Sequence, residues 1–281
     1  MACTIERIEI SQNPVPHNMV SRILALENTA LAAVGTAACI RTLWFRAHRI
    51  GKLHRFYGAV VSETEYVFGK QILRLKECIQ KALEDKTIEH IVVYVSCFEI
   101  ITMCDLEAEL AELELPEHVN LHIFYRGPLA KRTMDTEKNL QKIEAQIKLE
   151  TRSKECWQSK ELLPPELPDF AKIMLELREK DCDVLLLSPG GCKSCIEECT
   201  FEGFFPLKEK GADLYTTRVD DLSLSQGCPE LFGVIMETFS QDRLLILVES
   251  TAFRMIGFDS QNLAERLSQA GRRTVCMRKL D

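Results

Sequence analysis

Two stretches decide the fold, Leu31-Ala-Ala-Val-Gly-Thr-Ala-Ala-Cys39 and Val184-Leu-Leu-Leu-Ser-Pro-Gly-Gly-Cys192. Each is typical of a buried strand followed by a tight turn of small residues that ends in cysteine. A helical pattern precedes each of them, Arg22-Ile-Leu-Ala-Leu-Glu27 in the first case and Lys172-Ile-Met-Leu-Glu-Leu177 in the second. The chain therefore contains the same succession of helix, strand and turn twice.

The repeat continues beyond these stretches. Ile91-Val-Val-Tyr-Val-Ser-Cys97, with Ile100-Ile-Thr-Met-Cys-Asp105 behind it, matches Leu244-Leu-Ile-Leu-Val-Glu-Ser-Thr251 with Arg254-Met-Ile-Gly-Phe-Asp259 behind it. The offset between matched positions stays close to 154 residues, as from Cys97 to Thr251. Each half then closes with a helical pattern and a short strand, which indicates a duplicated folding unit.

Apolar strands bounded by turns and alternating with helices indicate βαβ units and parallel sheets covered on both faces. We therefore predict an α/β fold of two Rossmann-like parallel-sheet units related by internal duplication. The first unit is predicted over 1–130 and the second over 169–281. Between them, 131–168 reads as an exposed, highly charged connecting helix followed by the proline-rich linker Leu162-Leu-Pro-Pro-Glu-Leu-Pro168.

Composition limits the classes of partner and compartment. The chain has 281 residues and 46% hydrophobic residues, enough for a substantial core. Its net charge of −7, with both signs mixed along the length, argues against nucleic acid or an anionic membrane as partner. The N-terminal sequence lacks the order of a signal peptide, and no apolar run approaches the roughly 18 residues of a membrane helix, so a cytoplasmic protein is expected.

The twelve cysteines are expected to bind metal or to be buried rather than to form disulfides, because the cytoplasm keeps thiols reduced. Cys39, Cys97 and Cys192 each directly follow a predicted strand, at the sheet edge where α/β proteins bind ligands. Cys192-Lys-Ser-Cys195-Ile-Glu-Glu-Cys199 adds two sulfurs at compact spacing. These five cysteines are the predicted ligands of an iron–sulfur cluster.

The alternative for any cysteine is that it packs as a small apolar residue. Cys195 and Cys199 lie partly on a helix and can face away from the other thiols, and Cys104 is open to the same objection. Simple packing is the preferred interpretation for the six isolated thiols, Cys3, Cys78, Cys156, Cys182, Cys228 and Cys276.

Three short motifs recur in the same order in both halves. The first motif is Gly35-Thr-Ala-Ala-Cys39 in the first half and Ser188-Pro-Gly-Gly-Cys192 in the second. The second motif is Glu63-Thr-Glu-Tyr-Val-Phe-Gly69, and its counterpart is the stretch from Thr216-Thr to Gly227. The third motif runs from Cys97 to Asp105 and, in the second half, from Thr251 to Asp259. With these motifs the sequence resembles the nitrogenase component 1 (molybdenum-iron protein type) oxidoreductase family. That family has a Gly-Pro-x-Gly-Cys turn, a Val-Phe-Gly before a helix, and a strand that ends in cysteine before Ile-Gly-Asp-Asp.

The resemblance implies an oxidoreductase subunit with an iron–sulfur cluster, such as a 4Fe-4S cluster, at the interface of two pseudo-symmetric units. Electrons would come from an ATP-dependent iron-protein-like reductase. By position the ligands would be Cys39, Cys97 and Cys192, whereas Thr251 occupies the place of the remaining cysteine. Either Cys195 or Cys199 replaces it, or the cluster is smaller or lost.

The chain is shorter than the three-domain subunits of that family. It also has no counterpart of the cysteine and histidine that hold the active-site cofactor there, so dinitrogen reduction is not expected and no catalytic residue is assigned. Two other hypotheses stay open, namely a non-catalytic scaffold or accessory protein for metallocluster assembly and a degenerate family member that only binds a partner. A homo- or hetero-oligomer is compatible with each of them.

Two other kinds of functional site, a phosphate-binding loop and a histidine site, are less well supported by the sequence. Ser188-Pro-Gly-Gly-Cys-Lys193 lacks the Gly-Lys-Ser/Thr ending of a phosphate loop, so a tight turn is preferred to a nucleotide site. The six histidines, His17, His48, His54, His90, His118 and His122, show no metal-binding spacing and no pairing for nucleophilic catalysis.

Overall fold

The computed structural model of the chain describes residues 3–8, 18–126, 135–149, 165–177, 180–196 and 212–277. They form two compact units, one over 15–166 and the other made of 1–14 together with 167–281. We call them the four-stranded and the five-stranded unit, after their sheets. No helix in these described ranges combines the length and the apolar character needed to cross a membrane.

The four-stranded unit has an all-parallel sheet in the order β3-β2-β4-β5. Its strands are β2 (Thr29–Gly35), β3 (Phe56–Val60), β4 (His90–Val95) and β5 (Asn120–Tyr125). Its helices are α1 (Met19–Leu24), α2 (Ala37–Arg49), the short 3-10 helix η1 (Leu53–Arg55), α3 (Glu63–Val67), α4 (Gln71–Leu83), α5 (Cys97–Ile101), α6 (Leu106–Ala111) and α7 (Thr136–Gln146).

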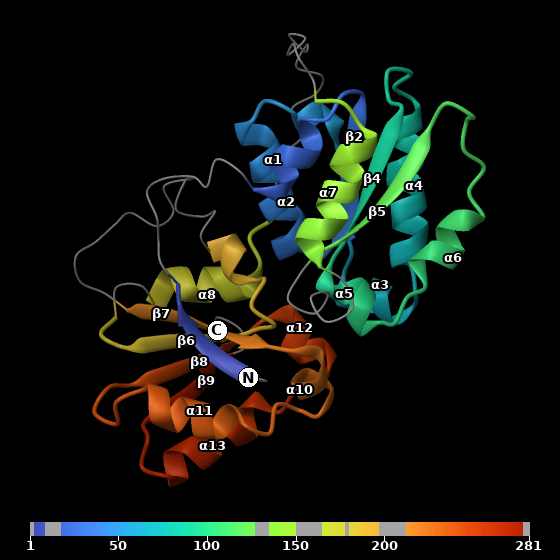
Figure 1. Cartoon of the computed structure of the whole chain (residues 1–281). Helices are drawn as coiled ribbons and strands as arrows, with labels where there is room; N and C mark the ends of the chain where they lie inside the picture. Colours follow the sequence, from blue (N-terminus) through green and yellow to red (C-terminus); the bar gives the residue numbers. More distant parts are fainter. Residues whose placement is uncertain are drawn as a thin grey trace. The chain divides into compact units, whose positions relative to one another are not determined.

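Helices cover both faces of this sheet, as Figure 1 shows with α7 and α4 on opposite sides. On the α7 side, Leu31 and Val92 of the central strands and the fully buried Phe124 of β5 pack with residues of α1, α2 and α7 in one core. Burying a phenylalanine side chain contributes about 2–3 kcal/mol to stability. Because side chains alternate along a strand, the neighbouring residues face α4, and the central strands are apolar on both faces.

The five-stranded unit has the order β1-β7-β6-β8-β9, parallel except for β1. Its strands are β1 (Cys3–Arg7), β6 (Asp183–Leu187), β7 (Asp213–Val219), β8 (Leu245–Glu249) and β9 (Thr274–Met277). Its helices are α8 (Asp169–Leu177), α10 (Asp221–Ser225), α11 (Leu231–Thr238), α12 (Thr251–Met255) and α13 (Ser260–Gln269). Figure 1 shows α8 on one face of the sheet and α11 and α13 on the other.

The two units repeat one topology, which confirms the predicted α/β class with two Rossmann-like units. Strands β2, β3, β4 and β5 correspond in chain order and in sheet position to β6, β7, β8 and β9. In both units the first strand of the repeat pairs with the second on one side and with the third on the other. The shared order follows from the matching succession of strands and helices in the two halves.

Local backbone features repeat as well. Met103 and Gly257 both adopt positive φ, 51° and 69°, at the end of the short helix that follows the third strand of the repeat. Asp105 and Asp259 then cap the next helix, and each side chain accepts a hydrogen bond from the amide three residues later. Glycine suits such a turn, so the methionine in the first unit is the more strained residue.

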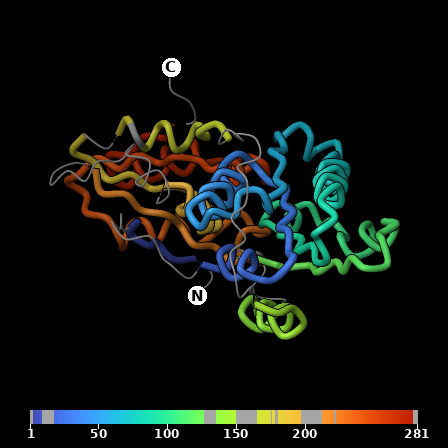
Figure 2. Tube along the Cα trace, turned by 90° about the horizontal axis from the view of Figure 1, so that it is seen from above, coloured from blue at the N-terminus to red at the C-terminus, as the bar shows by residue number. Residues whose placement is uncertain are grey.

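The N-terminal strand belongs with the C-terminal half of the chain, a feature that the sequence pattern did not predict. β1 pairs antiparallel with β7, from Cys3 opposite Val219 to Arg7 opposite Tyr215. Figure 2 shows this blue strand with the yellow-to-red part of the chain. β1 therefore belongs with the second unit, whereas the first unit was predicted to begin at residue 1.

Helix α7 is part of the four-stranded unit, whereas the sequence predicted an exposed connection over this region. Thr136, Leu140 and Ile143 lie at helical spacing and are buried, Leu140 completely. Arg22 of α1 forms ion pairs with Glu137 and Glu144 of α7, at 2.8 and 2.6 Å. The charged residues of α7 therefore surround a narrow apolar stripe that packs on the sheet, and residues 150–164 of the predicted linker lie outside the described residues.

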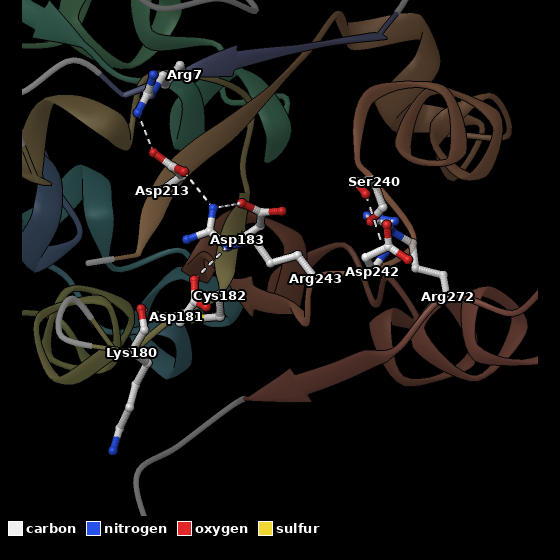
Figure 3. Close-up of polar contacts among 10 residues, drawn as sticks. All are labelled: Arg7, Lys180, Asp181, Cys182, Asp183, Asp213, Ser240, Asp242, Arg243 and Arg272. Atoms are coloured by element: carbon white, nitrogen blue, oxygen red, sulfur yellow. Dashed lines mark hydrogen bonds and ion pairs between the residues drawn. The ribbon is translucent and has the colours of Figure 1, made fainter. Parts of the chain in front are cut away.

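A network of charged side chains joins the amino ends of β6 and β7 (Figure 3). Arg243 Nη1 lies 2.8 Å from Asp183 Oδ1 and 2.6 Å from Asp213 Oδ2, and its Nε lies 3.1 Å from Asp181 Oδ1. Arg7 of β1 pairs with the other oxygen of Asp213. One guanidinium thus neutralises carboxylates at the start of two neighbouring strands, and Asp183 among them is nearly buried.

Candidate metal centre

The two predicted thiols of the four-stranded unit flank its topological switch point. β2 and β4 are adjacent and parallel, and their connections lead to opposite sides of the sheet, to β3 and to β5. Open α/β sheets bind ligands at the carboxyl ends of such a strand pair. Cys39 lies in the first turn of α2, after β2, and Cys97 is the first residue of α5, after β4.

Cys39 is packed closely against the end of its strand. A Cβ atom added to Gly35 would come within 3.0 Å of the Cys39 Cβ, so a side chain at position 35 would displace the thiol. Thr36, which precedes α2, donates its hydroxyl to Cys39 Sγ at 3.6 Å. Burial raises the pKa of the Cys39 thiol to about 11, and the negative charge of Glu99 acts in the same direction. Without a cation beside it, this sulfur is a protonated thiol at neutral pH.

A buried polar network lies next to Cys39. Tyr66 of α3 donates its phenolic hydroxyl to Glu99 Oε1 at 2.9 Å, and the Ser96 amide donates to Glu99 Oε2 at 2.7 Å. Both Tyr66 and Glu99 are almost completely buried. Burial raises the pKa of the Glu99 carboxyl, and it raises the pKa of Tyr66 well above its usual value. The network ties α3 to the start of α5 and so holds the loops around the switch point together.

Sequence reasoning missed Tyr66 and Glu99. The signal for Glu99 was present in Ser96-Cys-Phe-Glu99, the pattern of a capping box in which a serine and a glutamate three residues later satisfy free amides at a helix start. No sequence pattern connects Tyr66 with Glu99, since 33 residues separate them.

Cys39 and Cys97 share a neighbour in Tyr94, a partly buried residue of β4 whose pKa is raised. Burial is the main cause of that rise, and both thiols would add to it when ionised. Cys97 and Cys104 are half-buried like Cys39. Even so, among the residues that the structure describes, no three side chains of the types His, Cys, Asp or Glu come together as ligands of one metal ion.

The five-stranded unit presents its own thiols at the matching switch point, between β6 and β8. Cys192 lies in the turn after β6 and is half-buried, whereas Cys195, whose amide donates to the Cys192 carbonyl at 3.1 Å, is only 1% exposed. Thr251 is the first residue of α12, the position that Cys97 occupies in the other unit. Cys199 lies outside the described residues.

Four of the remaining thiols in the described part of the chain bear out the packing interpretation, whereas Cys276 is less buried than they are. Cys3, Cys78, Cys182 and Cys228 are between 1% and 6% exposed, and Cys276 is half-buried. Burial raises the pKa of Cys3 and of Cys228 to about 12. Cys156 falls outside the described residues. Cys39, Cys97 and Cys192 differ from the four core thiols in being half-buried, a property that they share with Cys104 and Cys276.

No protein-family model and no curated protein matches this chain. What the structure establishes is an α/β fold with one all-parallel and one mostly parallel sheet, and two Rossmann-like units that repeat the same strand order.

Proposed function

We propose that the protein is an oxidoreductase of the nitrogenase component 1 type, which holds an iron–sulfur cluster and receives electrons from a partner reductase. The observation that carries the proposal is the position of Cys39 and Cys97, one after each of the two strands that flank a switch point. Cys192 takes the corresponding place in the second repeat. The expected partner is an ATP-dependent iron-protein-like reductase.

The donor chemistry suits an iron–sulfur cluster, since thiolates are its usual ligands. The number of ligands is too small within either unit, because no three potential ligands lie together among its described residues. The ligand set that the resemblance implies is Cys39, Cys97 and Cys192 with Cys195 or Cys199 in place of Thr251.

When bound, such a cluster supplies one-electron transfer at a potential that its ligands and their hydrogen bonds set. The chain's own contribution near Cys39 is visible in two contacts. The Thr36 hydroxyl donates to Cys39 Sγ, a hydrogen bond of the kind that adjusts the electron density of a ligating sulfur. The hydrogen bond from Tyr66 to Glu99 holds α3 against the first turn of α5, in which Cys97 lies.

Anaerobic iron and sulfide analysis tests the ligand set. We expect the wild type to contain both elements and Cys39→Ala and Cys192→Ala to lose most of them, because each removes a predicted ligand. Cys78→Ala, which removes a buried thiol of α4, is the matched control and should keep its iron. Wild-type iron and sulfide in both Cys39→Ala and Cys192→Ala would rule out these ligands.

One observation favours a scaffold for cluster assembly as the second candidate. The thiols of Cys39, Cys97 and Cys192 are half-buried rather than sealed, so a cluster on them would be open to an acceptor protein. Incubation of the loaded protein with an apo-ferredoxin separates the two functions. A cluster that stays in place and is reduced reversibly supports the oxidoreductase, whereas transfer to the ferredoxin supports the scaffold.

A further inference from the structure

A pair of histidines, His90 of β4 and His122 of β5, lies away from the thiols. His90 is the first residue of β4, whereas Cys97 lies two residues beyond its last residue, Val95, so the strand length of about 17 Å lies between them. The parallel register sets His90 opposite Asn120 and Val92 opposite His122. The two imidazoles therefore project from the same face of β4 and β5, two positions apart along the sheet.

The ring nitrogens face each other. His90 Nδ1 lies 3.2 Å from His122 Nε2, and the rings are tilted by 41° with centroids 5.4 Å apart, so they meet at nitrogen atoms and are not stacked. Two imidazoles on a tetrahedral zinc ion, with bonds of about 2.0–2.1 Å, place their ligating nitrogens about 3.4 Å apart. The observed separation of 3.2 Å is that of a hydrogen bond between the rings, and small side-chain movements would bring it to the separation that an ion requires.

The surroundings keep both rings neutral and accessible. Burial lowers the pKa of His90 and of His122, and His90 lowers the pKa of His122 further, so lone pairs rather than protons are available at neutral pH. Both side chains are half-buried, which leaves room for water ligands on the ion. Glu89, exposed and next to His90, adds a negative charge that favours a bound cation.

We propose that His90 and His122 bind one divalent transition-metal ion of the zinc class through Nδ1 and Nε2, with water completing the coordination. In the metal-free protein one ring nitrogen of the pair carries the shared proton. In the bound protein both facing nitrogens coordinate the ion, and that proton moves to the far nitrogen of the same ring through solvent. Binding therefore changes the tautomer of one histidine and does not release a proton. The site is separate from the thiol centre and does not depend on it.

The test follows individual ring nitrogens, since zinc also binds free thiols in a chain with twelve cysteines. ¹⁵N-histidine-labelled protein is titrated with Zn²⁺ to millimolar concentration, and long-range ¹H–¹⁵N spectra are assigned with the variants His90→Gln and His122→Gln. We expect the facing nitrogens of His90 and His122 to move together to metal-bound shifts, with one ring changing tautomer. Each variant should weaken the response of the remaining ring at least about tenfold, because one of two protein ligands is lost.

His118→Gln is the matched control, since it removes an exposed histidine close in sequence and should leave the titration unchanged. Circular dichroism verifies that each variant is folded. If Zn²⁺ leaves the His90 and His122 nitrogens where they are, or if His90→Gln responds like the wild type at His122, the pair is only a hydrogen bond and the proposal is wrong. Loss of iron in Cys39→Ala would affect neither outcome.

Discussion

Replacement of Arg243 by alanine is expected to destabilise the five-stranded unit by about 2–3 kcal/mol at pH 7. Arg243 is the cation shared by Asp183 and Asp213, whose carboxylates start β6 and β7. The Asp183 side chain is only 8% exposed, and its pKa is raised by burial even with Arg243 present. Without this guanidinium, Asp213 keeps its ion pair with Arg7, but the poorly solvated carboxylate of Asp183 loses its ion pair with Arg243. Partial exposure of Arg243 and Asp213, 28% and 30%, keeps the expected loss below that of a fully buried pair.

The loss should depend on pH. Hydrogen bonding to Arg243 holds the pKa of Asp213 below its usual 3.8, so its contribution to stability is present above that pH and disappears as the pH falls through the folded-state value. In Arg243→Ala the part of this contribution that Arg243 supplies is absent at neutral pH, whereas the part that Arg7 supplies remains. The difference between variant and wild type is therefore largest above about pH 4 and shrinks as the pH falls through the folded-state pKa of Asp213.

Hydrogen exchange measured on peptides from β6 and β7 reports the opening free energy of this unit directly. Lys172→Ala is the matched control, because Lys172 pairs with Asp169 of the same unit on the surface, with both side chains about half exposed. Its expected loss is below about 0.5 kcal/mol. Equal protection in Arg243→Ala and Lys172→Ala at pH 7 would show that the charge network contributes nothing.

Replacement of Glu99 by alanine should destabilise the four-stranded unit by about 2–4 kcal/mol. The change leaves the Tyr66 hydroxyl buried without its acceptor and removes the cap from the Ser96 amide. It also leaves a cavity next to Phe98, whose ring packs on Tyr66 with centroids 5.0 Å apart. Hydrogen exchange at β4 and α5 measures the effect.

Glu99→Gln is the matched control for this position. A glutamine fits the same space, accepts from the Ser96 amide with its carbonyl oxygen and donates its amide to Tyr66, so its expected loss is below about 1 kcal/mol. A loss in Glu99→Gln as large as in Glu99→Ala would mean that the carboxyl group itself, rather than the satisfied hydrogen bonds, holds the loops together.

The same pair of variants reveals the titration of Glu99. Burial raises the folded-state pKa of this carboxyl above its ordinary 4.5, so the folded protein binds the proton more tightly than the unfolded chain. Its contribution to stability is therefore greatest below pH 4.5 and declines as the pH rises through the folded-state pKa. Glu99→Gln has no such group, and its stability should lack this decline over the same interval.

Much of the fold could be predicted from the sequence, because it depends on local patterns. The apolar runs around Leu31 and Val184, each between a helix and a small-residue turn, define buried parallel strands, and their recurrence defines two units. The placement of Cys39, Cys97 and Cys192 after strands also follows from local order, since the residue after a parallel strand must lie at the carboxyl edge.

The amino-acid sequence by itself thus determined the class, the duplication and the edge on which the thiols lie. Tertiary structure alone decided which distant side chains meet: β1 beside β7, Tyr66 on Glu99, and His90 facing His122 across 32 residues of sequence. Tertiary structure also showed that α7, which the sequence predicted as an exposed charged connection, packs on the sheet. The physical reason is that strand patterns are set by neighbours along the chain, whereas a hydrogen bond or ion pair depends on sheet order and register, which bring together segments that share no local signal.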